Sequence, residues 1–252
     1  MRPLIVIGNW KMNGSLASNQ DWVKTVARGM ESGMPAGRKF VVCPPFPYLS
    51  QCASMIKEHS LAFLSLGAQD ASAQSSGAYT GEVAASMLKE MGCSYVIVGH
   101  SERRLLHHEV DEVVAAKALE VLDNGMTPVI CVGETADERN SGRAQEIVCG
   151  QVAKQVSVLQ DRLADCLIAY EPVWAIGTGK VASAQVVQDM HRAIRLQLAE
   201  FDEDVASHVG ILYGGSVKPD NAVELFAMPD IDGGLVGGAS LNPQDFLAIC
   251  QA

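Results

Sequence analysis

The chain has 252 residues, a hydrophobic content of 48% and a formal net charge of −10. This length suits one or two domains and allows a large buried core. The acidic balance argues against nucleic acid as a partner, because phosphate backbones are held by many cations together and no basic cluster exceeds Arg103-Arg104.

Membrane insertion and export are also unexpected. No run of eighteen apolar residues occurs, so we expect no membrane-spanning helix. The stretch from Leu4 to Ile7 is too short for the core of a signal peptide. The seven cysteines are an odd number without a Cys-x-x-Cys pair, which favours reduced thiols over a disulfide framework or a zinc site. We therefore expect a cytoplasmic protein.

One unit repeats eight times along the chain. Eight short apolar runs start 24 to 43 residues apart, the size of a strand plus a crossover helix. Most are continuous rather than alternating, as is typical of parallel strands covered on both faces. In chain order they are Leu4–Trp10, Lys39–Pro44, Phe63–Gln69, Ser94–His100, Thr127–Gly133, Cys166–Glu171, Val209–Gly214 and Gly233–Gly237.

Between the runs the apolar period becomes helical. One expected helix ends at Asn124-Gly125, and its apolar face holds Val110, Val113, Val114, Val121 and Leu122. Another begins after Ser183, a plausible N-cap, and its apolar face holds Val187, Met190, Ile194, Leu198 and Phe201.

Eight such units without a linker predict an α/β fold, a single (β/α)8 TIM barrel that spans residues 1–252 as one catalytic domain. The alternative is a doubly wound open sheet. That fold usually carries G-x-G-x-x-G after its first strand, whereas residues 8–14 read Gly-Asn-Trp-Lys-Met-Asn-Gly. The barrel is the prediction.

Active sites of such barrels lie at the carboxyl ends of the strands, so polar residues just past each run are the candidates. These are Asn9, Lys11, His100, Glu102 and Glu171. The seventh and eighth runs end in Gly214-Gly215-Ser216 and Gly237-Gly238, and small-residue turns that lead into helices offer N–H groups to a phosphate.

The stretch from Ala169 to Lys180 has proline and glycine residues at positions typical of a hinged loop. Pro172 follows Glu171 and stops the strand, and Gly177 and Gly179 let the backbone swing after an apolar segment. This arrangement indicates a base beneath a mobile loop. An ordinary strand-to-helix loop with one solvated glutamate is the alternative.

Two motif matches fail on their spacing. Residues 177–181 are not a P-loop, because Trp174 stands where its first glycine belongs. His107-His108-Glu109 has no second histidine at metalloprotease spacing. We expect no metal and no cofactor.

Five segments together resemble the triosephosphate isomerase family, over the whole chain and in unbroken order. They are Asn9–Gly14, Gly99–Arg104, Ala169–Lys180, Tyr213–Val217 and Leu235–Leu241. The resemblance implies interconversion of dihydroxyacetone phosphate and glyceraldehyde 3-phosphate through an enediol(ate), without cofactor or metal.

The resemblance also implies a role for each matching residue. Glu171 matches the base, and His100 matches a neutral imidazole that acts as the electrophile. Lys11 and Asn9 match residues that hold the substrate and stabilise developing charge. The matches to the N–H donors for the phosphate are Gly177, Ser216, Gly237 and Gly238. Glu102 matches a supporting residue that serves either proton traffic or the positioning of Lys11, and Ile176 and Leu235 match an apolar clamp over the base.

In the family the third loop, here Gln69 to Glu82, docks into the partner of a homodimer and brings Thr80 near the other subunit's site. Asp70 departs from the family, which commonly has Asn there. A buried, poorly paired Asp70 predicts that Asp70→Asn tightens the dimer, and an exposed one predicts little change. Neither case predicts marked weakening.

Two other functions stay open from sequence. A phosphosugar-binding barrel without turnover would need neither Glu171 nor His100. A Schiff-base aldolase would need a desolvated lysine with its own acid–base partner, and no apolar pocket adjoins Lys11 in the sequence.

Overall fold

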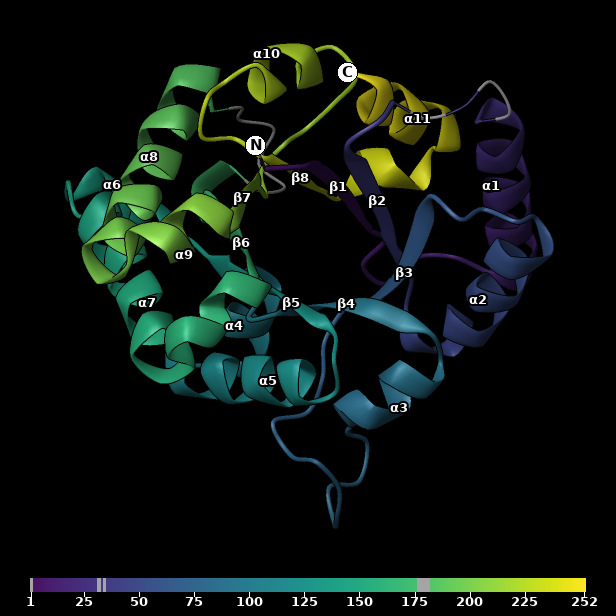
Figure 1. The fold of residues 1–252 in the computed structure, drawn as a ribbon, viewed down its shortest axis with the longest axis horizontal. Coiled ribbons are helices and arrows are strands. Elements are labelled where there is room, and N and C mark those ends of the chain that lie inside the picture. Colours follow the sequence, from purple (N-terminus) through teal and green to yellow (C-terminus); the bar gives the residue numbers. More distant parts are fainter. Residues whose placement is uncertain (1, 31–32, 34, 176–181) are drawn as a thin grey trace.

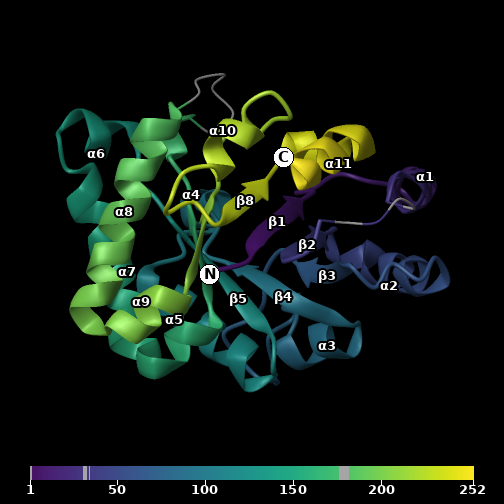
Figure 2. The same cartoon turned by 45° about the horizontal axis from the view of Figure 1, so that its top comes forward.

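The computed structural model describes residues 2–30, 33, 35–175 and 182–252. Eight parallel strands close into a barrel in chain order, surrounded by helices (Figures 1 and 2). The predicted TIM barrel is confirmed, and each apolar run overlaps one strand, although β2 and β4 begin one residue before their runs. The strands are β1 Leu4–Asn9, β2 Arg38–Cys43, β3 Leu64–Ala68, β4 Cys93–Val98, β5 Thr127–Val132, β6 Leu167–Tyr170, β7 Gly210–Tyr213 and β8 Gly233–Val236.

Helices connect successive strands on the outside of the barrel. The α-helices of the described chain are α1 Leu16–Gly29, α2 Leu49–Glu58, α3 Ala85–Glu90, α4 Ser101–His107, α5 Asp111–Asp123, α6 Ala136–Asn140, α7 Ala144–Leu159, α8 Ala184–Phe201, α9 Glu203–His208, α10 Ala222–Phe226 and α11 Pro243–Gln251. Short 3-10 helices lie at Phe46–Tyr48, Gln160–Asp165, Val173–Ala175 and Gly238–Leu241.

The first and last strands pair and close the barrel. β1 pairs with β8 in the register Ile5↔Gly233 to Gly8↔Val236. Gly233 is required there, because a Cβ would lie 1.9 Å from the carbonyl oxygen of Ile5. On the outside, α11 lies beside α1, so both ends of the chain cover the same part of the barrel (Figures 1 and 2).

The two helices predicted in detail are confirmed, with corrections to their faces. Ser183 caps α8, and Val187, Met190, Ile194 and Leu198 are buried. Phe201 is exposed, so its place on that face was wrong. On α5 the buried residues include Val114 and Val121, whereas Val110, the N-cap, and Val113 are exposed. The buried face of α5 is completed by Ala115, Lys117 and Ala118.

The core has two compartments separated by the sheet. A larger one lies between the strands and the helices. The smaller one fills the barrel with every second residue of the strands, since successive side chains of a strand point to opposite faces. Its members are Ile5, Ile7, Val41, Cys43, Tyr95, Ile97, Val129, Cys131, Leu167, Ala169, Leu212 and Leu235. This packed interior makes the barrel a rigid support for the loops at its ends.

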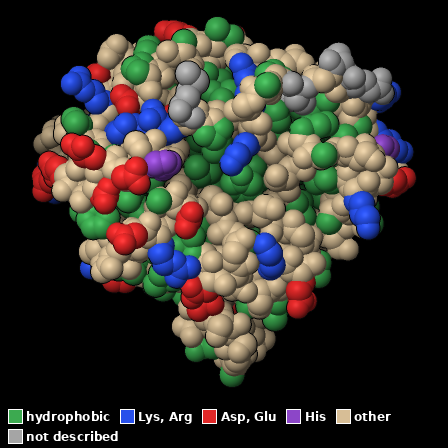
Figure 3. Space-filling view, in the orientation of Figure 1, with side chains coloured by type: hydrophobic (Ala, Val, Ile, Leu, Met, Phe, Trp, Pro, Cys, Tyr) green, Lys and Arg blue, Asp and Glu red, His purple; other side chains and the backbone are tan. Residues whose placement is uncertain are grey.

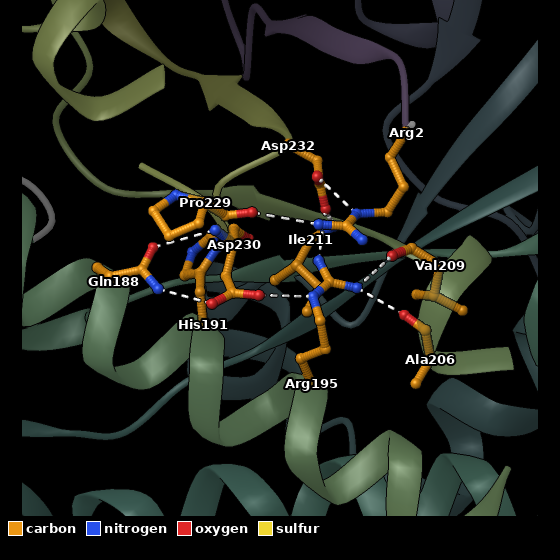
Figure 4. Close-up of polar contacts among 10 residues, drawn as sticks. All are labelled: Arg2, Gln188, His191, Arg195, Ala206, Val209, Ile211, Pro229, Asp230 and Asp232. Atoms are coloured by element: carbon orange, nitrogen blue, oxygen red, sulfur yellow. Dashed lines mark hydrogen bonds and ion pairs between the residues drawn. The ribbon is translucent and has the colours of Figure 1, made fainter. Parts of the chain in front are cut away.

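A buried ion-pair cluster fixes the starts of the last strands (Figure 4). Arg195 of α8 contacts Asp230 at 2.9 Å and Asp232 at 2.6 Å, and Asp232 also contacts Arg2 at 2.7 Å. The guanidinium of Arg195 also donates to the carbonyl oxygens of Ala206 and Val209. Because two carboxylates and two carbonyls receive this one side chain, it ties α8, α9 and the segment before β8 together.

The loop between β3 and α3 projects furthest from the barrel (Figure 1). At its base Asp70 is 8% exposed and contacts Lys117 at 2.7 Å and Arg103 at 2.9 Å. Farther along, Tyr79 is 48% exposed. Asp70 is therefore buried and well paired, which neither alternative weighed from sequence describes. Among the described helices, none is both long and apolar enough to span a membrane.

Candidate active site

A cavity of about 530 Å³ opens at the carboxyl ends of the strands. It collects residues from the ends of five strands, β1, β4, β6, β7 and β8. Among those that line it are Asn9, Lys11, His100, Glu171, Ser216, Leu235, Gly237 and Gly238. The structure thus brings together all the catalytic and phosphate-binding candidates in the described chain. Gly177 and Ile176 lie outside the described residues.

Glu171 follows β6 directly and is 1% exposed. Its Oε2 accepts a hydrogen bond from the backbone N–H of Ser101 at 2.7 Å, and its Oε1 lies 2.9 Å from Nε2 of His100. Burial alone would raise the pKa of Glu171, but the hydrogen bonds donated by His100 and by the N–H of Ser101, with the charge of Lys11, lower it. The carboxylate is ionised and held by two donors in this state.

Two glycines make room for this carboxylate. A Cβ on Gly133 would lie 1.9 Å from the carbonyl oxygen of Glu171, and one on Gly214 would lie 2.7 Å from its Cγ. Any larger residue at either position would push the strand end or the side chain aside. The ends of β5 and β7 therefore fit closely around the end of β6.

His100 lies between β4 and α4 and is the N-cap of that helix. Its Nδ1 accepts the backbone N–H of Glu102 at 3.2 Å, and Nε2 faces Glu171. Burial lowers the pKa of His100, but the carboxylates of Glu171 and Glu102 raise it above its ordinary value overall. The raised pKa favours the protonated ring, whereas the hydrogen bond at Nδ1 favours the neutral ring. Hydrogen-bond geometry decides for the neutral ring, because a protonated Nδ1 would set two donors face to face.

Lys11 reaches the cavity from a strained backbone just beyond β1. Its φ is 52°, in the left-handed region that lysine rarely occupies. Asn9 accepts the backbone N–H of Lys11 at 3.0 Å, and Gln69 donates to its carbonyl oxygen at 2.8 Å. The ammonium pairs with Glu102 at 2.5 Å. The end of β1, the residue after β3 and helix α4 therefore each contribute a side chain that holds this lysine in place.

The phosphate-binding candidates form small-residue turns after β7 and β8. Gly237 precedes the 3-10 helix Gly238–Leu241, and its carbonyl accepts from the hydroxyl of Ser240 at 2.7 Å. Ser216 lies in the turn after β7, where Asn221 donates to its carbonyl oxygen at 3.0 Å. Lys11 approaches the same region, since a Cβ on Gly237 would lie 3.5 Å from its Cε. Backbone N–H groups and the ammonium of Lys11 thus share this part of the cavity.

Sequence reasoning missed Glu134, a fully buried carboxylate two residues after β5. It accepts from the hydroxyl of Tyr170 at 3.1 Å, the indole N–H of Trp174 at 2.8 Å and Arg139 at 3.0 Å. The guanidinium of Arg139 also lies 4.5 Å from the centre of the Trp174 ring. Glu134 therefore fixes the segment just after Glu171. The rule that selected Glu171, a polar residue at a strand end, would have selected it too.

A buried carboxylate, a neutral imidazole and an ammonium around one cavity, with small-residue turns beside them, are typical of a barrel enzyme that moves protons on a small anionic substrate. The comparisons with known proteins agree with that class. The family model described as triosephosphate isomerase matches residues 4–252. The chain belongs to the triosephosphate isomerase family.

Individual relatives cover the chain from end to end. The chain is 90% identical over 252 residues, all of both chains, to the triosephosphate isomerase of Polynucleobacter asymbioticus. It is 88% identical, again over both whole chains, to that of Polynucleobacter necessarius. A more distant relative, from Cupriavidus pinatubonensis, is 53% identical over 253 residues and is covered completely. The resemblance drawn from five segments is confirmed.

Proposed function

We propose that this protein interconverts dihydroxyacetone phosphate and D-glyceraldehyde 3-phosphate by proton transfer through an enediol(ate). One observation carries this proposal: Glu171, His100 and Lys11 face a single cavity at the carboxyl end of the barrel. The family and its relatives, each named triosephosphate isomerase, supply the reaction. The protein is thus an isomerase that uses its own side chains, without metal or cofactor.

The phosphate would be held by backbone N–H groups of Ser216, Gly237 and Gly238, together with Gly177, which lies outside the described residues. N–H groups in turns that lead into helices favour an anion. Asn9 and Lys11 would hold the rest of the substrate, and the ammonium would stabilise negative charge as it develops. Lys11 is paired with Glu102 in this state, so Glu102 would steady the ammonium until the substrate replaces one of its contacts.

Glu171 would act as the base. It would take a proton from one carbon of the substrate and return it to the neighbouring carbon. In the present state two donors occupy its oxygens and depress its basicity. The carboxylate must therefore leave the N–H of Ser101 and the ring of His100 before it can accept a proton. Apolar cover by Leu235 and by Ile176, outside the described residues, would then raise its basicity by desolvation.

His100 would act as the electrophile. The neutral ring carries its proton on Nε2, the atom that faces Glu171 and the cavity. Once Glu171 moves, that N–H is free to donate to the substrate oxygen on which charge grows. The same event therefore frees both catalytic groups. The N–H of Glu102 at Nδ1 maintains the tautomer throughout.

Residues 172–180 would close over the bound phosphate. The described part of this segment, Pro172 to Ala175, is anchored through Trp174 to Glu134 and Arg139. A fixed near end and a glycine-rich far end are the arrangement that a hinged lid needs. Closure would shield the enediolate from water while it could still lose phosphate.

We also propose a homodimer through the loop from Gln69 to Glu82, with Thr80 near the partner's site. Exposed apolar side chains support it. Met12, next to the catalytic lysine, is 94% exposed, Leu16 is 64% exposed and Tyr79 is 48% exposed. Exposed apolar side chains of this size are better covered than left in water. Sedimentation at falling concentration tests this, and a monomer at micromolar concentration would overturn it.

A single domain over residues 1–252 and a cytoplasmic location complete the proposal. The barrel uses strands from Leu4 to Val236, which leaves no room for a second core. All seven cysteines are free thiols. Free buried thiols are typical of a reducing compartment.

The two alternatives have less support. A binding barrel without turnover would have no use for the contact between Glu171 and His100. A Schiff-base aldolase needs a lysine that readily becomes neutral, whereas Lys11 is paired with a carboxylate. A coupled assay with D-glyceraldehyde 3-phosphate, repeated with EDTA, tests the proposal. Turnover that is unchanged by the chelator is expected, and absence of turnover would refute it.

A further inference from the structure

A second cavity, of about 460 Å³, lies at the opposite end of the barrel, where the strands begin. Figure 3 looks onto this end and shows a hollow near its centre, with hydrophobic side chains inside and basic and histidine side chains around it. The packed barrel interior, including Ile7, Ile97 and Val129, separates it from the active-site cavity. This cavity therefore needs its own explanation.

The cavity exists because the first layer of the barrel interior is incomplete. Lys39, Tyr95 and Thr127 each precede by two residues a side chain that packs inside the barrel, so they point to the same side of their strands. The equivalent positions on β7 and β8 are Gly210 and Gly233, which contribute no side chain. Three polar groups thus surround a space that elsewhere in the barrel is filled by apolar side chains.

Tyr95 is the informative member of this layer. It is only 9% exposed and lines the cavity, and its hydroxyl, which makes no hydrogen bond within the described chain, remains accessible from the cavity. Such a hydroxyl can hydrogen-bond to a molecule that enters the cavity. Burial raises the pKa of Tyr95, so the phenol keeps its proton and remains a donor. The hydroxyl can therefore donate to an acceptor that enters the cavity.

Neighbouring groups define the charge of that acceptor. Lys39, exposed at the start of β2, and Thr127 likewise have no side-chain partner in the described chain, and both line the cavity. An ammonium and two hydroxyl groups suit an anionic head group. Asp165, the one carboxylate of the lining, lies just before β6, opposite β2 in a barrel of eight strands. It repels an anion from that side and favours a head group beside Lys39.

Apart from His208, the rest of the lining is apolar and includes Ile5, Leu122, Met126 and Leu167. A cavity of this volume is in the range of small-molecule sites. Apolar walls with a few polar groups at one side suit a molecule with an apolar body and one charged end. We propose that this basal cavity binds a small organic carboxylate with an aromatic or branched apolar body, its head group held by Lys39, Tyr95 and Thr127. The site is independent of the isomerase reaction.

Phenylacetate is a suitable probe, and titration calorimetry on the whole protein measures its affinity. We expect saturable binding at one site per chain, and at least tenfold weaker binding to Lys39→Met and to Tyr95→Phe. The matched control is Lys218→Met, which removes a lysine that lines the active-site cavity. Its affinity for phenylacetate should stay within twofold of wild type.

Two further measurements locate the site and check its charge. In an NMR titration the backbone amides of Tyr95 and Thr127 should shift, also in the presence of excess inorganic phosphate. Phenethylamine, an amine of the same size, should bind at least tenfold more weakly than phenylacetate. No binding of phenylacetate at millimolar concentration, equal binding to the Lys39 and Tyr95 variants, loss of binding in Lys218→Met, or stronger binding of the amine would each overturn the proposal.

Discussion

Replacing the carboxylate of Glu171 by an amide separates catalysis from binding. Glu171→Gln keeps the shape of the side chain, and its carbonyl oxygen can still accept from Nε2 of His100. The amide nitrogen then faces the N–H of Ser101, which loses its acceptor. An unsatisfied buried donor costs about 1–3 kcal/mol, so we expect the variant to fold with a reduced free energy of unfolding.

The loss of turnover should be much larger than this structural effect suggests. An amide cannot take a proton from carbon, and a positioned general base contributes about 10²–10⁴-fold to a rate. That range corresponds to roughly 3–5.5 kcal/mol of activation free energy. The inhibition constant of inorganic phosphate should change less than threefold, because backbone N–H groups near Ser216 and Gly237 are unaffected.

Steady-state kinetics in both directions, with phosphate as a competitive inhibitor, measure these quantities. Glu171→Asp is the matched control. It retains a carboxylate but moves it back by about 1 Å, a displacement that can cost about 10²-fold in rate. Its turnover should therefore lie between those of wild type and Glu171→Gln. Turnover of Glu171→Gln within tenfold of wild type would show that another group is the base.

Three further predictions concern other titratable and charged groups. NMR titration of the His100 ring should show no imidazolium near pH 7, because Nδ1 accepts the N–H of Glu102, and an imidazolium signal there would contradict the assigned role. Burial lowers the pKa of His191 to about 4, below its unfolded value, so the stability it confers is present above about pH 6.5 and is lost as the pH falls toward 4. Urea unfolding at a series of pH values should show that the wild-type protein loses about 3 kcal/mol from this source between pH 7 and 4 and that His191→Gln does not. Identical pH profiles of the two proteins would refute the prediction. Arg195→Met should lower the free energy of unfolding by about 3 kcal/mol, because it removes the cationic partner of Asp230 and one of the two cations that contact Asp232, whereas Arg162→Met, which breaks an exposed pair with Asp123, should cost less than about 1 kcal/mol.

The barrel and most of its site could be predicted because the fold converts order along the chain into position in space. Once eight strands are recognised, their carboxyl ends must meet, and Asn9, His100 and Glu171 must meet with them. The structure brings these three to one cavity. The neutral state of His100 was harder to predict, since it depends on which atom faces Nδ1. Only the geometry shows that the N–H of Glu102 occupies that position.

Errors arose where periodicity could not say how far an element is covered. Val113 and Phe201 continue the apolar pattern of their helices but are exposed, and they lie in the first turn of α5 and at the last residue of α8. Conversely, Lys117 lies on the buried face of α5, a position that a pattern of apolar residues assigns to hydrophobic side chains. The reason is an ion-pair cluster that no local pattern reveals.

That cluster also shows why Asp70 could not be interpreted from sequence. Asp70 and Glu109 share both Lys117 and Arg103, so two carboxylates and two cations alternate in a closed ring. Four residues from three segments must be placed before the ring can be recognised. Burial raises the pKa of Asp70 although both cations oppose it, so this carboxylate has a high desolvation cost that the ring offsets. In Asp70→Asn the amide oxygen would still accept from one of the two cations. The NH2 group would face the other cation, which is also a donor, or would have to turn away from it. The ring joins the base of the projecting loop to α4, the helix that begins at Ser101, beside His100 and Glu171. A change at Asp70 would therefore be felt at both the proposed interface and the active site.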